Sequence, residues 1–110
     1  MRYRVQILKN RKLVILLGIH MKKVIIDFKP NAWDSYEKLS KDKRLGGLAK
    51  RYFGELFGFP PEQWGKLRKE FGKDAFVSDN HTPFIIKVIV VEDKADSVWL
   101  YVTEFSPRRA

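Results

Sequence analysis

Cysteine is absent from the chain, which excludes disulfide bridges and thiolate metal sites. Only two histidines are present, His20 and His81, and no paired metal-ligand spacing accompanies them. A Walker loop, a dinucleotide-binding glycine motif and a nucleophile elbow are also missing. We therefore expect neither a metal nor a cofactor, and most familiar enzyme classes lose support. The lack of cysteine fits a reducing compartment and favours a cytoplasmic location.

Long hydrophobic runs are missing too. The longest, residues 13–19, follows a basic stretch and is far shorter than the roughly 20 residues needed to span a bilayer. This arrangement resembles the first two regions of a signal peptide, but no small-x-small cleavage site follows it. The sequence leaves a buried strand and a targeting segment open, and favours the strand. We expect no membrane partner.

Positive charge is what the chain has in excess. It carries 22 Lys and Arg against 13 Asp and Glu, a net charge of +9 on 110 residues. A field of this sign attracts polyanions, so the expected partner is nucleic acid, with RNA favoured, or an acidic protein. The alternative is a generally basic surface that serves solubility or heat stability.

The basic residues gather near the two chain ends. The first 23 residues carry seven Lys and Arg and no acidic residue. If the terminal strands were neighbours, both ends would form one surface that contacts phosphates without reading bases. Tyr3 and Tyr101 would offer stacking faces for unpaired bases. The predicted nucleic-acid-binding residues are Arg2, Arg4, Lys9, Arg11, Lys12, Lys22, Lys23 and Arg109.

The length and a 45% hydrophobic composition predict one domain, residues 1–110, in which residues 1–20 are an N-terminal hairpin extension. Alternation and β-branched runs predict strands at residues 3–7, 13–17, 24–28 and 75–77, and a closing hairpin of residues 84–91 and 98–105. Regular alternation in the last strand places Trp99, Tyr101, Thr103 and Phe105 on one face. The opposite face then receives Val98, Leu100, Val102 and Glu104.

Helical spacing dominates the centre of the chain. Residues 31–39 predict a helix that Asn31 caps, with Asp34 three residues on in a capping-box position. Residues 45–57 repeat apolar side chains at i, i+3, i+4 and i+7. Pro61 opens a third predicted helix, residues 61–71, with apolar residues on one side. The expected fold is α+β, an antiparallel sheet with two to three helices packed on it, in the order strands, helices, strands.

The polar loop of residues 78–83 holds His81 beside Asp79 and Asn80, where an imidazole can act as a general acid or base near neutral pH. A turn residue in a solvated loop is the other interpretation of His81. The acidic residues Glu92, Asp93 and Asp96 predict a solvated hairpin tip rather than a metal site.

The order of elements over residues 21–109 resembles that of RelE/ParE-type toxins: a strand, a helical hairpin that holds AWDSYEKL, and a closing hairpin. Some members of that superfamily cleave messenger RNA on the ribosome, and others act on gyrase. The resemblance implies an antitoxin partner and places Lys87, Tyr101 and Arg108 on a concave face with acid–base and cationic roles.

Three functions follow as hypotheses. The first is an RNA-associated protein of toxin-like fold, a metal-independent and ribosome-dependent endoribonuclease that uses general acid–base groups. The second is a non-catalytic nucleic-acid-binding module, and the third is a protein-interaction module that uses exposed aromatic residues. A catalyst requires Lys87, Tyr101 or His81 to converge with Arg108.

Overall fold

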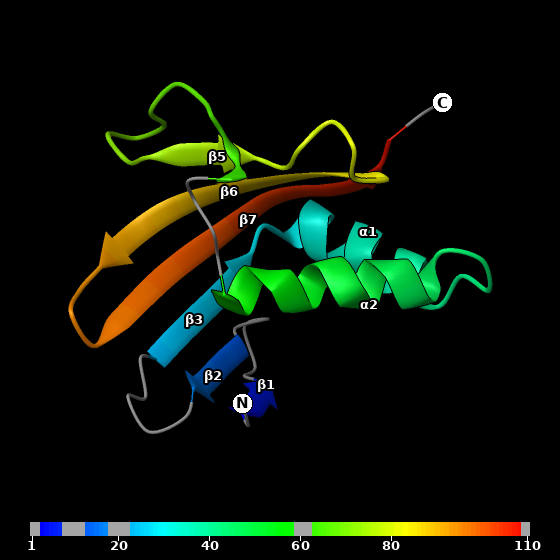
Figure 1. Cartoon of the computed structure of the whole chain (residues 1–110), viewed down its shortest axis with the longest axis horizontal. Coiled ribbons are helices and arrows are strands. Elements are labelled where there is room, and N and C mark those ends of the chain that lie inside the picture. Colours follow the sequence, from blue (N-terminus) through cyan, green and yellow to red (C-terminus); the bar gives the residue numbers. More distant parts are fainter. Residues whose placement is uncertain (1–2, 8–12, 18–22, 59–62, 109–110) are drawn as a thin grey trace.

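The computed structural model describes residues 3–7, 13–17, 23–58 and 63–108. Of the predicted nucleic-acid-binding residues, Arg2, Lys9, Arg11, Lys12, Lys22 and Arg109 lie outside the described residues. The α+β class is confirmed (Figure 1). The elements are β1 (Tyr3–Ile7), β2 (Leu13–Leu17), β3 (Lys23–Phe28), α1 (Pro30–Ser40), α2 (Gly46–Glu55), the 3₁₀ turn η1 (Leu56–Gly58), β4 (Gly65–Lys66), β5 (Ala75–Val77), β6 (Phe84–Asp93) and β7 (Ser97–Pro107).

One mixed sheet contains all the described strands, in the order β1-β2-β3-β7-β6-β5-β4. The strands β3 and β7 run parallel, from Lys23 opposite Ser97 to Phe28 opposite Val102, while the other neighbours are antiparallel. The predicted antiparallel sheet is therefore wrong at its centre. The helices between β3 and the closing hairpin form the long connection that parallel neighbours require.

The helices α1 and α2 lie side by side over one face of this sheet (Figure 1). The first begins at Pro30, which has no N–H to leave unpaired and holds Lys29 extended at φ −59° and ψ 139°. The predicted cap by Asn31 is wrong, because Asn31 lies inside the helix and α1 has no side-chain cap. At the turn between the helices, Asp42 Oδ1 accepts hydrogen bonds from the N–H groups of Arg44 and Leu45, at 2.7 and 2.8 Å.

An aromatic core joins the helices to the sheet. The ring of Tyr36 stacks on Phe53 with centroids 4.8 Å apart, and Phe53 stacks on Phe28 at 5.8 Å. Burial raises the pKa of the Tyr36 phenol above its usual value. The largest fully buried side chains are Phe84, Phe105, Ile26, Leu56, Ile86, Leu100, Val88 and Val102. Because strand side chains alternate, the residues between these strand positions face the side of the sheet without helices.

A β-bulge changes the faces of the last strand. Lys87 pairs with Glu104 while the next residue, Val88, pairs with Val102, so Thr103 is an additional residue in β7. Phe105 is consequently in the core, 1% exposed, and Glu104 faces the other side with Lys87. Regular alternation predicts the opposite for both residues, and that prediction is wrong because one inserted residue reverses the alternation beyond it.

The third predicted helix is also wrong for the part that the structure describes. Residues 65–77 form an irregular hairpin in which Gly65 pairs with Val77, and the backbones of Glu70 and Lys73 exchange two hydrogen bonds of 3.0 and 2.9 Å. The two residues between them have positive φ, +54° at Phe71 and +73° at Gly72, as in a type I′ turn. Pairing along the edge of the sheet therefore overrides a weak helical spacing.

Phe71 is unusual at this turn. Its side chain is 93% exposed, and its left-handed backbone costs a bulky residue roughly 1–2 kcal/mol. The helical spacing predicts that Phe71 shares one face of a helix with Trp64 and Leu67, whereas in the structure neither burial nor backbone preference accounts for a phenylalanine here.

Candidate functional site

The face of the sheet without helices carries two of the four predicted catalytic residues. Lys87 lies on β6, and its ammonium is 3.3 Å from a carboxylate oxygen of Glu104 on β7. Tyr101 lies opposite Ile89, two residues along from Lys87, so the two side chains are diagonal neighbours. Asp27 of β3 lies on the other side of Tyr101. The structure thus brings Lys87 and Tyr101 to one region beside two carboxylates.

The other two predicted catalytic residues lie at the C-terminal end of β7. The Arg108 guanidinium donates to the backbone oxygens of Thr82 and Asp79, at 3.1 and 3.2 Å. His81 is exposed in the same turn, where its backbone N–H donates to Asp79 Oδ1 at 2.8 Å. Arg108 is four residues beyond Glu104, the partner of Lys87, which corresponds to about 13 Å along a strand. The four residues therefore form two separate pairs.

The two basic chain ends do not meet along the sheet. The strands β2 and β3 separate β1 from β7. Arg4 is in register with Leu16, Leu16 with Lys23, and Lys23 with Ser97 at the start of β7. Arg108 follows the other end of that strand, eleven residues from Ser97, or roughly 35 Å away. A single basic surface built from both ends is thus absent from the described residues.

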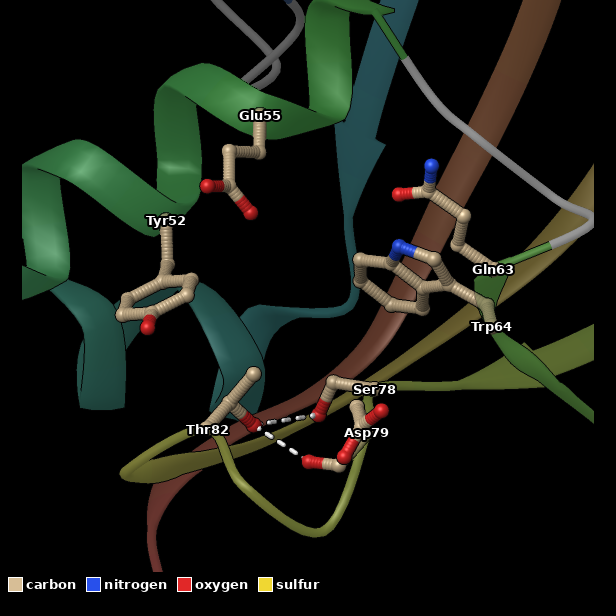
Figure 2. A pocket seen from close by; sticks show the side chains of 7 residues that line it. All are labelled: Tyr52, Glu55, Gln63, Trp64, Ser78, Asp79 and Thr82. Carbon is tan, nitrogen blue, oxygen red and sulfur yellow. Dashed lines mark hydrogen bonds between the residues drawn. The ribbon is translucent and has the colours of Figure 1, made fainter.

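A hollow of about 140 Å³ opens beside the turn that Arg108 holds (Figure 2). Figure 2 shows the rings of Tyr52 and Trp64 on opposite sides of it, with the Glu55 carboxylate directed from α2 into the space between them. Its lining residues are Tyr52, Glu55, Gln63, Trp64, Ser78, Asp79 and Thr82. Three segments thus contribute to it: α2, the residues before β4, and the β5–β6 turn.

Hydrogen bonds make the floor of the hollow rigid. Ser78 is 4% exposed, and its hydroxyl donates to the Phe84 oxygen at 2.9 Å while it accepts from the Ile86 N–H at 3.0 Å. The Thr82 hydroxyl lies 2.7 Å from both the Asp79 and the Phe84 backbone oxygens. The floor is therefore preformed, and a ligand would meet a fixed polar surface below two aromatic rings.

The size and lining of the hollow limit what can occupy it. Its volume is several times the ~30 Å³ of one water molecule but below the roughly 300–1,000 Å³ typical of drug-sized ligands. It therefore suits one planar ring or one side chain. The carboxylates of Glu55 and Asp79 accept hydrogen bonds and repel anions, so the occupant must offer donors and carry no negative charge.

Sequence reasoning missed this hollow and the exposed Phe71. No motif contains Tyr52, Glu55 or Trp64. These residues are brought together by the packing of α2 against the edge of the sheet. Gly72 was the one usable signal at this turn, because two-residue hairpin turns often end in glycine, although their first residue is usually asparagine, aspartate or glycine rather than phenylalanine.

Comparisons with known proteins identify no relative: no family model, curated protein or solved structure matches the chain. No group of three potential metal ligands occurs in the described ranges. Within those ranges, none of the helices is both long and apolar enough to cross a membrane.

Proposed function

We propose that the protein binds single-stranded nucleic acid, with RNA favoured, and seats one unpaired base in the hollow between Tyr52 and Trp64. The observation that carries the proposal is the lining of this hollow, which combines two aromatic rings with hydrogen-bond acceptors on a rigid floor. Unpaired bases are commonly bound by stacking on aromatic rings and by hydrogen bonds to their edges.

The overall charge and the hollow make opposite demands on one ligand. A net charge of +9 attracts a negatively charged polymer, whereas Glu55 and Asp79 repel negative charge from the hollow itself. A nucleic acid meets both demands, because its phosphates are anionic and its bases are neutral, and adenine, guanine and cytosine carry amino groups. Carboxylates are suitable acceptors for such amino groups. An acidic peptide meets only the first demand, since its side chains bring no donor to the hollow.

A pair of single substitutions with the same change in charge tests the hollow. Glu55→Gln removes one carboxylate from the lining, and Glu37→Gln removes one from α1, which does not line the hollow. Both variants raise the net charge to +10, so long-range attraction to phosphates changes equally. We expect Glu37→Gln to bind as tightly as the parent or more tightly, and Glu55→Gln to weaken about fivefold for the preferred base.

The measurement is fluorescence anisotropy of labelled single-stranded RNA and DNA homopolymers and of duplex RNA, from 50 to 300 mM salt. Affinity should fall steeply as salt rises. Absence of binding to every nucleic acid at the lowest salt would refute the proposed function. If the two glutamine variants bound every sequence with equal affinity, the hollow would have no part in nucleic-acid binding.

Metal-independent RNA cleavage on the helix-free face is the second candidate function, as the resemblance to RelE/ParE-type toxins implies. The grouping of Lys87, Tyr101, Glu104 and Asp27 favours it, because a carboxylate can act as a general base and an ammonium can stabilise the negative charge on the phosphoryl oxygens. Cleavage of RNA with and without ribosomes, lost in Lys87→Ala and retained in Glu55→Gln, would support this candidate. Absence of cleavage under both conditions would exclude it.

A further inference from the structure

The hairpin of residues 65–77 ends in a phenylalanine that the fold does not use. Phe71 is 93% exposed, and it occupies a left-handed position at which asparagine or glycine is favoured. A backbone outlier that brings no packing in return is a reason to look for a role outside the fold.

The charges of this hairpin suggest the kind of partner. Lys66, Arg68, Lys69 and Lys73 are all exposed, against the two acidic residues Glu70 and Asp74. Lysines on an edge strand also prevent strand-to-strand aggregation, and this role would account for the cations. It would not account for Phe71, because an exposed aromatic ring at the tip of the hairpin favours association.

The position of the hairpin connects its tip to the hollow. Trp64 of the hollow immediately precedes β4, and the first arm runs from Gly65 to Phe71 along the outer edge of the sheet (Figure 1). Six residues cover at most about 20 Å, the length of a fully extended chain. A few nucleotides of single strand span such a length, which is within the roughly 4–16 nucleotides typical of one small binding domain.

We propose that Phe71 stacks on a second unpaired base of the bound single strand, a few nucleotides from the base in the hollow, while Lys69 and Lys73 contact the flanking phosphates. This inference rests on the proposed function. Aromatic side chains that insert between or stack on bases are an established mode of contact, and the neighbouring cations supply the attraction to phosphate. A membrane surface fits less well, because a single aromatic side chain buries too little apolar area for stable attachment.

The test is a substitution whose effects on stability and binding have opposite signs. Phe71→Asn keeps the turn and suits its left-handed backbone, so the melting temperature should be unchanged or higher. Binding to a single-stranded decanucleotide should weaken about tenfold, within the range for loss of one stacked base. Phe71→Tyr should retain binding. Leu48→Gln, which removes an exposed apolar side chain from α2, is the matched control and should leave binding unchanged.

Oligonucleotide length separates this inference from the proposed function. A trinucleotide that only fills the hollow should bind Phe71→Asn and the parent equally, whereas the decanucleotide should distinguish them. Failure of the parent to bind any oligonucleotide would refute the proposed function. Parent-like affinity of Phe71→Asn for the decanucleotide would refute only the role of Phe71. That role would also be overturned if Phe71→Asn weakened binding only to vesicles of anionic phospholipid. The same would follow if its weaker binding to the decanucleotide came with a lower melting temperature.

Discussion

Deletion of one residue from the longest strand should be nearly neutral if the β-bulge is placed correctly. Without Thr103, the order Leu100, Tyr101, Val102, Glu104, Phe105 alternates regularly between the core and the helix-free face. The pairs of Lys87 with Glu104 and Val88 with Val102 can then persist. The deletion removes one weak hydrogen bond, from the Thr103 hydroxyl to the Lys87 oxygen at 3.4 Å. We expect a loss of about 1 kcal/mol in the free energy of unfolding.

Deletion of Tyr101 is the matched control, because it removes another half-buried residue from the same strand. The least costly repair moves Val102, 0% exposed, to the outer face and buries the Thr103 hydroxyl in its place. Exposing a valine costs about 1.5–3 kcal/mol, and burying a hydroxyl adds about 1–3 kcal/mol. The expected loss is therefore about 2.5–6 kcal/mol, a large part of the ~5–15 kcal/mol available to an ordinary domain.

Thermal and urea unfolding followed by circular dichroism measure both deletions. A difference of 1 kcal/mol corresponds to about 4–8 °C in the melting temperature of a domain of 60–100 residues. The Thr103 deletion should melt within about 10 °C of the parent, and the Tyr101 deletion should melt far lower or fail to fold. If the two deletions were equally damaging, β7 would alternate regularly, and the assignment of Phe105 to the core and Glu104 to the helix-free face would be refuted.

Three further predictions concern the helices. Gly54→Ala should stabilise α2 by about 0.5–1 kcal/mol, since nothing lies within 4 Å of the added Cβ. Gly46→Ala should destabilise the protein, because its added Cβ would lie 2.7 Å from the Ser40 backbone oxygen. Urea unfolding of both variants measures the two effects. Backbone hydrogen bonds lower the pKa of Asp42. Its contribution to stability is therefore present above the unfolded pKa of about 3.9 and is lost as the pH falls through the lower folded pKa. The free energy of unfolding, measured from pH 5 to 2, should depend less steeply on pH in Asp42→Ala than in the parent. Burial raises the pKa of Tyr36, so its stabilising effect is complete below pH ~10 and declines as the pH rises through the higher folded pKa. An ultraviolet titration should show a phenol that ionises at unusually high pH, and this phenol should be missing in Tyr36→Phe.

Elements with a strong local signal were predictable from the sequence. The closing hairpin emerged from its β-branched runs, and α2 from its repeated helical spacing, because a long periodic segment can bury its apolar side chains in only one way. The short strand at residues 75–77 was predicted correctly as well. The direction of β7 beside β3 was not predictable, since it depends on where the chain returns after the helices.

The candidate site was less predictable, for reasons that particular residues illustrate. Alternation correctly placed Tyr101 on the opposite face from Leu100, but it failed beyond the bulge at Thr103, because nothing in the local sequence marks an inserted residue. The hollow joins Tyr52, Trp64 and Thr82 from three segments, so only the folded chain brings them together. Phe71 was grouped with the apolar side of the third predicted helix, because a hydrophobic residue gives the same sequence signal whether it is buried or exposed.

The two candidate functions use different parts of the surface, and this separation makes them distinguishable. Binding can use contacts spread along the surface, as over up to about 20 Å from Trp64 to Phe71 at the edge of the sheet, because the effects of well-separated contacts add. Cleavage cannot, because its acid, base and cation must surround one phosphate. Lys87 is about 13 Å along the strands from Arg108, Tyr101 is farther still, and Arg108 is engaged by the turn at residues 79–82. If cleavage occurs, it therefore depends on Lys87 and its neighbours alone, and Arg108→Lys should leave it largely unchanged.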